Sequence, residues 1–395
     1  MTTLTKAPRT VLLVLLLSLA PDVAFAWFLK GPAKTVSTAA VLGGAGAVGA
    51  AVAYWNRSAA VASRLYTPAP NSLATKTVLI TGASTGLGLE SAKRLAVGGA
   101  NLILTARSKE KGQAAVDQVR QYLVDSGIPA EQQQDVSFQL VDLDNLDSVR
   151  QAANWNIGTK IDVLLNNAGI MALPERELTV DGFEKQMQSN HLGHFALTAV
   201  LAPKLSEKAR IINVSSTAHT FARGGLLFDY MWKADSDYGA WKSYGQSKLA
   251  NIFFTQELQR RIERSGLGWT ALTLHPGVVG TDLGRNMMGP EKYAAMKEGN
   301  GSLVQTTLMK VMAAFLKTPE QGATTQIWLA SAAATEVTGG QYYIDCKARG
   351  LSDFATDQAA QERLWKESEQ LSGVEFNVGA AVSAKTEEEE TTVAA

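Results

Sequence analysis

Residues 77–88 constrain the fold most, because an apolar, β-branched run leads directly into three glycines: Thr-Val-Leu-Ile-Thr-Gly-Ala-Ser-Thr-Gly-Leu-Gly. A helical pattern rich in Leu and Ala follows at residues 89–97. This order predicts a strand, a tight turn and a helix, as in the first βα unit of a dinucleotide-binding fold. Glycine allows the sharp turn and the close approach of backbone to a pyrophosphate, and the helix N-terminus supplies free N–H groups for the phosphates.

The spacing of these glycines, Gly-x3-Gly-x-Gly, is not specific by itself. It differs from the common G-x-G-x-x-G spacing, and no Gly-Lys-Ser/Thr follows, which excludes a P-loop. A glycine-rich turn that binds nothing is the alternative that this stretch alone leaves open. If the turn binds a cofactor, the residues expected to contact it here are Thr81, Gly82, Ser84, Thr85, Gly86, Leu87 and Gly88.

Strand and helix patterns alternate along the rest of the chain. They predict a single α/β catalytic domain built on a doubly wound parallel sheet with helices on both faces. Strands are expected at 78–81, 101–106, 136–141, 161–166, 210–215, 269–275 and 340–344. Helices are expected at 89–97, 109–124, 146–153, 182–206 (with a break allowed), 244–265 and 319–330.

Composition excludes several other classes of protein. The 395 residues carry 37 basic and 37 acidic side chains, so no net charge attracts nucleic acid. The single cysteine, Cys346, rules out an internal disulfide framework and a Cys-rich metal site. His191 and His194 are three residues apart, but no acidic or Cys partner lies near them in sequence, so they are interpreted as structural. We therefore expect no metal and no nucleic-acid partner.

The N-terminus has the composition of a targeting segment. Lys6 and Arg9 precede an apolar run at residues 11–20, and an Ala-Phe-Ala sequence follows. A basic region, a short apolar core and a small-residue cleavage site predict a signal peptide at residues 1–26. The apolar run is short for a membrane span, and an uncleaved anchor is the alternative.

A second leader-like stretch follows at residues 27–72, which contain basic but no acidic side chains. It resembles a transit peptide, and its Ala- and Gly-rich part at 39–55 is equally compatible with a weak membrane anchor. The catalytic domain is expected at 73–375 and an acidic, disordered tail at 376–395. We expect a secretory-route membrane location, with the endoplasmic reticulum favoured and a plastid as the alternative.

Further motifs fall at the ends of expected strands and at the start of a helix: Asn166-Asn-Ala-Gly169, Asn213-Val-Ser-Ser216, Tyr244-Gly-Gln-Ser-Lys248 and His275-Pro-Gly277. With the glycine turn, and in this order, they resemble the short-chain dehydrogenase/reductase family, which implies a Rossmann fold over about residues 73–374. The strings at 189–195, 244–251, 275–282 and 342–346 are similar to its retinol dehydrogenase and WW-domain oxidoreductase-like branch.

Tyr244 and Lys248 are four residues apart and therefore share a helix face. A phenol with an ordinary pKa of about 10 is a poor acid or base at neutral pH, and a nearby ammonium is expected to lower that pKa. Tyr244 can then exchange a proton with a carbonyl or alcohol oxygen. The resemblance implies that Ser216, with Ser215 as the alternative, hydrogen-bonds the same oxygen. It also implies that Asn190 helps to hold Lys248 and a proton-relay water.

The position after the second expected strand holds Arg107, where an NAD site usually offers a carboxylate. A guanidinium suits the 2′-phosphate of NADP(H), which we predict as the cofactor. A surface arginine on a loop is the alternative. The resemblance implies further cofactor contacts, besides Tyr244 and Lys248, from Asp142, Leu143, Asn166, Asn167, Ala168, Gly169, Pro276, Gly277, Val279 and Thr281.

Residues 285–317 occupy the place of the family's substrate lid and are rich in Met and Leu, which suits an irregular apolar ligand or, equally, the core of a lid helix. The expected reaction is hydride transfer between NADP(H) and an apolar carbonyl or alcohol that is retinoid-, steroid- or lipid-aldehyde-like. A C=C reduction like that of protochlorophyllide reductase and a non-catalytic dinucleotide-binding scaffold are the alternatives. Because relatives often pair through helices, a homodimer is a further expectation.

Overall fold

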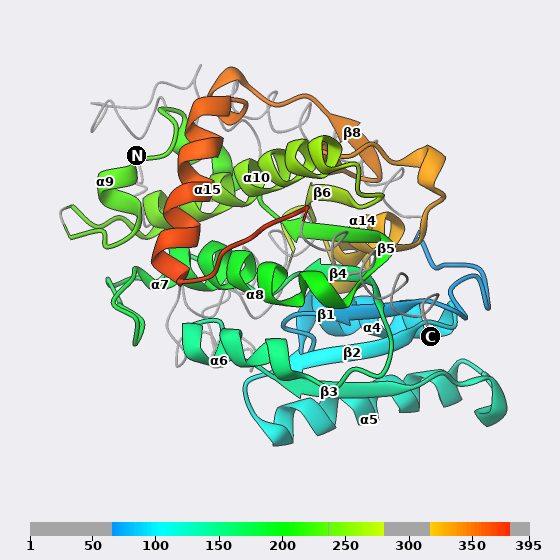
Figure 1. Ribbon diagram of the computed structural model, residues 1–395. Coiled ribbons are helices and arrows are strands. Elements are labelled where there is room, and N and C mark those ends of the chain that lie inside the picture. The colour runs from blue at the N-terminus through cyan, green and yellow to red at the C-terminus, as the bar shows by residue number, and fades with distance from the viewer. Residues whose placement is uncertain (1–64, 236, 280–316, 380–395) are drawn as a thin grey trace, which may run out of the picture. The chain divides into compact units, whose positions relative to one another are not determined.

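The computed structural model describes residues 65–235, 237–279 and 317–379 (Figure 1). An eight-stranded sheet runs through this part of the chain in the order β3-β2-β1-β4-β5-β6-β7-β8. The strands from β1 to β7 pair in parallel, and β8 pairs with β7 antiparallel. The strands are β1 (Thr77–Ile80), β2 (Asn101–Ala106), β3 (Val136–Leu140), β4 (Ile161–Asn166), β5 (Leu205–Val214), β6 (Thr270–His275), β7 (Tyr342–Ile344) and β8 (Lys347–Arg349).

The predicted parallel sheet is confirmed, and β1 lies in its interior. Every residue of β1 is buried, and Leu79 pairs with Ile103 of β2 and with Leu164 of β4. Strands buried on both faces have near-continuous apolar sequences, which is why the β1 pattern could be recognised. The short β8 was not predicted. It forms because Asp345 and Cys346 both adopt positive φ, at 51° and 58°, and so make a two-residue hairpin turn after β7.

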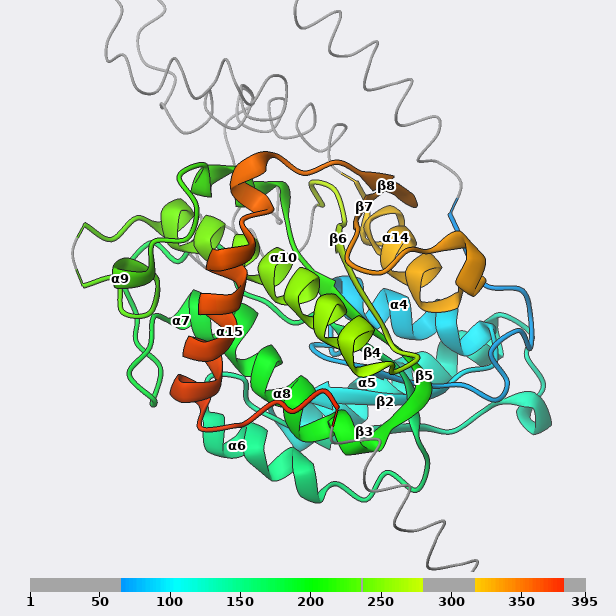
Figure 2. The same cartoon turned by 45° about the horizontal axis from the view of Figure 1, so that its top comes forward.

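Helices cover both faces of the sheet (Figures 1 and 2). One face packs against α4 (Gly86–Val97), α5 (Lys109–Asp125) and α14 (Pro319–Ser331) through side chains such as Leu95, Val119 and Ile327. The other face packs against α6 (Leu146–Arg150), α8 (Gly193–Leu201) and α10 (Ala240–Ser265) through side chains such as Val149, Phe195 and Phe253. The sheet is therefore doubly wound, as predicted.

The helix predicted at 182–206, for which a break was allowed, is broken, and its predicted bounds are wrong. The chain instead forms α7 (Lys185–Met187), a π turn η3 (Gln188–Leu192), α8, and then a short 3₁₀ turn at 202–204. Strand β5 begins at Leu205, five residues before its predicted start, because Leu205 pairs with Ile161 across a register shift in the ladder. Two other helices begin early: α4 at Gly86 rather than 89, and α10 at Ala240 rather than 244.

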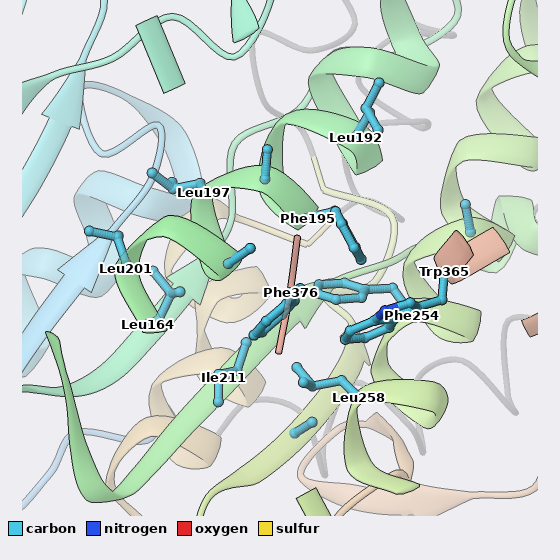
Figure 3. Packing of buried hydrophobic residues seen from close by; sticks show 14 of the residues in the cluster. Leu164, Leu192, Phe195, Leu197, Leu201, Ile211, Phe254, Leu258, Trp365 and Phe376 are labelled. Carbon is cyan, nitrogen blue, oxygen red and sulfur yellow. The ribbon is translucent and has the colours of Figure 1, made fainter. Parts of the chain in front are cut away.

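The C-terminal helix α15 (Gln358–Ser372) was not predicted, although it completes the core on the face of α8 and α10. Its Trp365 is 1% exposed and packs edge-on against Phe195, with ring centroids 5.1 Å apart (Figure 3). Phe376 stacks on Trp365 at 5.0 Å and is 2% exposed. The folded domain therefore continues past residue 375, where the tail was expected to begin.

Short elements complete the described chain: 3₁₀ turns at 130–132, 151–154, 217–222 (η5), 334–336 and 353–355, and α9 (Phe228–Met231). At the start, the buried Leu73 and a hydrogen bond from Arg94 to the Tyr66 carbonyl attach the linker to the domain. Within the described residues, no helix is both long and apolar enough to span a bilayer. Several predicted segments lie outside the described residues: the signal segment at 1–26, the part of the 27–72 segment up to residue 64, the lid up to residue 316, Thr281, and the tail from residue 380.

Candidate active site

The carboxyl ends of β1 and β4 are neighbours at the point where the strand order reverses, which is where open α/β sheets bind ligands. The turn after β1 begins at Gly82, with φ at 62°. A Cβ at Gly82 would lie 2.9 Å from Ala168 Cα, and a Cβ at Gly88 would lie 2.5 Å from the Gly82 carbonyl oxygen. Gly86 also has positive φ, at 58°. The turn therefore requires glycine at each of these positions.

The Thr81 hydroxyl joins the glycine turn to the turn after β4. Its oxygen accepts hydrogen bonds from the backbone N–H groups of Asn167 and Ala168, both at 2.9 Å. The Asn167 side chain in turn donates to the Thr81 carbonyl at 2.8 Å. Thr81 is fully buried, so its hydroxyl positions the two turns. By contrast, Thr85 is exposed and Ser84 is half-buried at the N-terminus of α4, where Thr85 makes no side-chain cap.

Asn190 lies within the π turn η3. Its carboxamide hydrogen-bonds the backbone of Ile170, in the segment that follows the turn after β4. The side-chain oxygen accepts from the Ile170 N–H at 2.8 Å, and the side-chain nitrogen donates to the Ile170 carbonyl at 3.0 Å. The same nitrogen donates to the Ser247 hydroxyl at 2.9 Å. Asn190 thus contacts α10 through Ser247 rather than through Lys248 itself. π turns inside helices are frequent at functional sites.

Lys248 is 4% exposed and donates from Nζ to the Val214 carbonyl at 3.1 Å. A Cβ at Gly169 would lie 3.0 Å from Asn190 Oδ1 and 3.4 Å from Lys248 Nζ. Gly169 therefore lies against both predicted site residues, and any larger residue there would press on them. The structure brings the turn after β4, the π turn and α10 together.

The two serines after β5 have different partners. Ser215 is 2% exposed, and its hydroxyl donates to the backbone carbonyl of Lys248 at 2.7 Å. The Ser216 hydroxyl hydrogen-bonds Tyr244 and also accepts from the Ala218 N–H at 3.1 Å, capping η5. This arrangement favours Ser216 over Ser215 as the hydroxyl beside the phenol.

Burial controls the acidity of the phenol and the ammonium. It raises the pKa of Tyr244 to about 12, against a smaller lowering by the hydrogen bond from Ser216. It also lowers the pKa of Lys248 to about 7. Lys248 Nζ lies 5.7 Å from the centroid of the Tyr244 ring. The expectation that the lysine lowers the pKa of the tyrosine is therefore wrong for these side chains, because desolvation of the phenolate outweighs any effect of the distant ammonium.

An aromatic wall, defined here as Phe221 and Trp241, flanks Tyr244. The rings of Phe221 and Trp241 meet edge-on with centroids 5.7 Å apart, and Trp241 meets Tyr244 at 6.1 Å. The wall is possible because Gly245 lets α10 approach η5: a Cβ there would lie 2.8 Å from the Ala218 carbonyl oxygen. Sequence reasoning missed this wall. The signal was available, since both aromatic residues lie in the extra length before Tyr244.

The turn after β6 is held by a residue that was not predicted. Gly277 has φ at 97°, which favours glycine, and Lys317 Nζ donates to the Pro276 carbonyl at 3.3 Å. Lys317 also forms an ion pair with Asp345 in the hairpin turn after β7. Val279 packs against α14 next to the buried Leu87 of α4. A Cβ placed at Gly322 of α14 would lie 2.6 Å from the Val279 side chain and 2.8 Å from the Leu87 side chain.

Arg107 lies after β2, and its side chain is 62% exposed. Its guanidinium is 3.8 Å from a carboxylate oxygen of Asp144, whose pKa is raised by burial. The Asp142 carboxylate accepts from the Asp144 N–H at 3.1 Å, and Leu143 between them is buried. The two predicted adenine contacts, Asp142 and Leu143, therefore lie in the same turn as the acidic partner of Arg107.

Cys346 lies in the turn between β7 and β8, with its sulfur 4.0 Å from the Thr324 carbonyl oxygen. Among the described ranges, no group of three or more His, Cys, Asp or Glu side chains could hold a metal ion.

Comparisons with known proteins agree with this geometry. The family model described as short chain dehydrogenase matches residues 76–228. Retinol dehydrogenase 13 from Homo sapiens is 37% identical over 312 residues, covering 78% of this chain and 88% of the relative. Short-chain dehydrogenase TIC 32 B, chloroplastic, from Brassica napus is 34% identical over 300 residues, covering 73% and 86%.

Among solved structures, an uncharacterised protein from Mycobacterium paratuberculosis is 34% identical. The match covers 80% of this chain and 98% of that protein, with a TM-score of 0.59. The extent of these matches, together with the motifs gathered at the ends of β1, β4 and β5, leads to one assignment: the chain belongs to the short-chain dehydrogenase/reductase family of oxidoreductases, in its retinol dehydrogenase-like branch.

Proposed function

We propose that the protein interconverts a carbonyl and an alcohol on an apolar substrate, with NADP(H) as the hydride carrier. The observation that carries this proposal is the cluster of Ser216, Tyr244 and Lys248, in which the serine hydroxyl bonds the phenol and the lysine lies on the next turn of α10. Bound NADP(H) would supply the hydride, and the protein would supply binding, orientation and the proton.

Tyr244 is the proposed acid. Because burial raises its pKa to about 12, the phenol is protonated at neutral pH and can donate a proton to a carbonyl oxygen as that oxygen gains negative charge. The Ser216 hydroxyl would bond the same oxygen. This protonation state favours the reductive direction, which is also the direction expected in a reducing compartment.

Lys248 and Asn190 are the proposed path by which Tyr244 regains its proton. Burial lowers the pKa of Lys248 to about 7, so this amine can gain or lose a proton near neutral pH. Asn190 would hold a relay water, and its carboxamide is fixed by Ile170 and Ser247. Gly169 leaves room between the amine and the carboxamide.

The residues after β2 support NADP(H) over NAD(H). Arg107 is exposed and can turn its guanidinium to a 2′-phosphate, whose charge it would neutralise. Asp144 holds the arginine at 3.8 Å and would align it. The turn of Gly82–Gly88 and the uncapped N-terminus of α4 would receive the pyrophosphate. Pro276, Gly277, Val279 and Thr281 would line the nicotinamide.

The aromatic wall supports an apolar substrate. The rings of Phe221 and Trp241 lie beside Tyr244, the proposed proton donor. They would contact an apolar substrate through their edges and faces. The relatives named retinol dehydrogenases point to a retinoid-like aldehyde or alcohol, and steroid and lipid aldehydes share its apolar character.

A purified-protein assay tests the proposal. NADPH oxidation would be followed with retinal, a steroid ketone, a fatty aldehyde and a quinone, and with NADH in place of NADPH. We expect turnover with at least one carbonyl, its loss in Tyr244→Phe, and retained NADPH binding in that variant. Light-dependent turnover with a chlorophyll precursor alone would favour the C=C reductase. NADPH binding without turnover of any of these substrates would favour the scaffold.

The leader is proposed to direct the folded domain that follows it to a membrane-bounded compartment. The endoplasmic reticulum is the first candidate, and the chloroplastic relative from Brassica napus supports the plastid as the second. A fluorescent protein fused after residue 72 would distinguish the two and report membrane association. A homodimer would need a surface other than the face of α8 and α10, because α15 covers Phe195 and Phe254 there.

A further inference from the structure

His194 connects the cofactor side of the site with the proton-relay side. It lies in the first turn of α8 and is 2% exposed. Its Nε2 is 2.9 Å from the hydroxyl oxygen of Thr81, and its Nδ1 is 3.0 Å from the backbone carbonyl oxygen of Asn190. One imidazole thus touches the residue that joins the two cofactor turns and the π turn that carries Asn190.

These partners determine which nitrogen carries the proton. The Asn190 carbonyl can only accept, so Nδ1 of His194 carries the hydrogen and Nε2 is the acceptor. Thr81 must then donate its hydroxyl proton to Nε2 at 2.9 Å, rather than to the Leu165 carbonyl at 3.4 Å. Its oxygen stays free to accept from Asn167 and Ala168, as observed.

The backbone of His194 is also linked to a second set of buried polar side chains. The His194 carbonyl accepts from the Thr198 hydroxyl at 2.7 Å, and Thr198 accepts from the Asn166 side chain at 3.0 Å. Asn166 in turn donates to the Asn213 side chain at 2.8 Å. Burial also lowers the pKa of His194 to about 4, which keeps the ring neutral. The network therefore has one arrangement of donors and acceptors at neutral pH.

We propose that His194 is a positioning residue that fixes two parts of the site at once. Through Thr81 it sets the turn of Asn167 and Ala168 against the glycine turn, and through the Asn190 carbonyl it sets the π turn. The roles of these parts in binding and proton transfer rest on the proposed function. The hydrogen-bond arrangement around His194 follows from the observed contacts and does not depend on that function.

His191 provides a matched comparison. It is equally buried and lies one helical turn away, but its Nε2 is 2.9 Å from the Ser368 hydroxyl of α15. It packs among the rings of Phe195, Trp232 and Phe254 in the aromatic part of the core. A purely structural histidine of this segment should therefore behave like His191.

Two amide substitutions separate the two contacts of His194. In H194N the side-chain nitrogen can take the place of Nδ1 and keep the bond to Asn190, but it cannot reach Thr81. In H194Q the carboxamide oxygen can take the place of Nε2 and keep the bond to Thr81, but the bond to Asn190 is lost. H191Q is the matched control, and all variants are made in the full chain.

We expect H194N to raise the Kd for NADPH, followed by fluorescence titration, by ~10-fold, the effect of one lost hydrogen bond at a binding site. Its kcat should stay within ~2-fold of the wild type. We expect H194Q to lower kcat by ~10-fold while the NADPH Kd stays within ~2-fold. H191Q should change neither value, although it lowers the melting temperature.

The proposal is overturned if both His194 variants match H191Q in Kd and kcat and differ only in melting temperature. It is also overturned if ¹⁵N NMR of the wild type, assigned by the signals missing in H194N, shows the proton on Nε2. The NMR and NADPH-binding results do not require turnover. If every carbonyl fails as a substrate, the proposed function fails, and the tautomer still decides the arrangement around His194.

Discussion

The Ser215 hydroxyl donates a hydrogen bond to the backbone carbonyl of Lys248, with 2.7 Å between the two oxygens. The next residue, Ser216, has extended backbone and directs its hydroxyl to Tyr244. Because successive side chains of extended backbone point in opposite directions, one serine holds the backbone of α10 and the other faces its phenol.

This division of partners predicts different losses at the two serines. Ser216→Ala should lower kcat by ~100-fold or more, since it removes the hydroxyl beside the reacting oxygen. Ser215→Ala should lower the free energy of unfolding by ~1 kcal/mol, the usual cost of one internal hydrogen bond, with a much smaller change in kcat. Steady-state kinetics and urea denaturation measure the two effects, and a larger kcat loss at Ser215 would reverse the assignment.

Lys248 should make the protein less stable while it serves the reaction. Burial lowers its pKa from 10.5 to about 7, so between these values the unfolded chain binds more protons than the folded chain. Stability from this group therefore rises as pH increases from about 7 to 10.5, and is lowest below 7. At pH ~7, Lys248→Met should raise the free energy of unfolding by roughly 1–3 kcal/mol and abolish turnover.

Denaturation of Lys248→Met and wild type across this pH range provides the measurement. The advantage of the variant should shrink as the pH approaches 10.5. The Val214 carbonyl keeps a donor in the variant, because Asn251 also donates to it at 3.1 Å. An advantage that grows with pH would contradict the linkage.

Arg107 should determine the choice between the two nicotinamide cofactors. Arg107→Ala removes a charged partner of the 2′-phosphate and should raise the KM for NADPH by ~10–100-fold, with little effect on NADH. Asp144→Asn is the control, since it keeps the guanidinium but weakens its alignment, and should have a smaller effect. An equal rise in KM for NADPH and NADH in Arg107→Ala would show that the arginine is a surface side chain that does not recognise the 2′-phosphate.

Trp241 should affect large apolar substrates more than small ones. Trp241→Ala removes the ring that meets both Phe221 and Tyr244, and should raise KM for a retinoid or long-chain aldehyde by ~10-fold, through lost apolar contact. A two- or three-carbon aldehyde that does not reach the ring serves as the comparison. If KM rises equally for both, the tryptophan acts by displacing Tyr244.

The parts of the fold that were predictable are those in which local sequence meets a local physical demand. Gly82 is favoured by its own positive φ, and Gly88 is required by the close approach of the nearby Gly82 carbonyl oxygen, so their pattern predicted the turn. Tyr244 and Lys248 share a helix face at any point along a regular helix, so their proximity needed no tertiary information. The parallel strands were visible because burial on both faces makes them apolar throughout.

Other features depend on packing between distant segments. The pKa of Tyr244 is set by its burial beside η5 and the aromatic wall. The four-residue spacing between Tyr244 and Lys248 does not reveal this burial. The π turn that carries Asn190 has an ordinary helical sequence, so only the surrounding contacts show it. Because the sequence of α15 is mostly polar, it did not indicate that Trp365 and Phe376 complete the core.

The late position of α15 has a consequence for biosynthesis. Phe195 and Phe254 emerge from the ribosome well before Trp365 and Phe376, the rings that cover them. Until synthesis is nearly finished, the nascent chain therefore presents an uncovered aromatic surface, the kind of surface that chaperones bind and that aggregates when left alone. A ribosome that stalls before codon 358 would release a chain that has its glycine turn and its Tyr244 but lacks the helix that covers these aromatic rings.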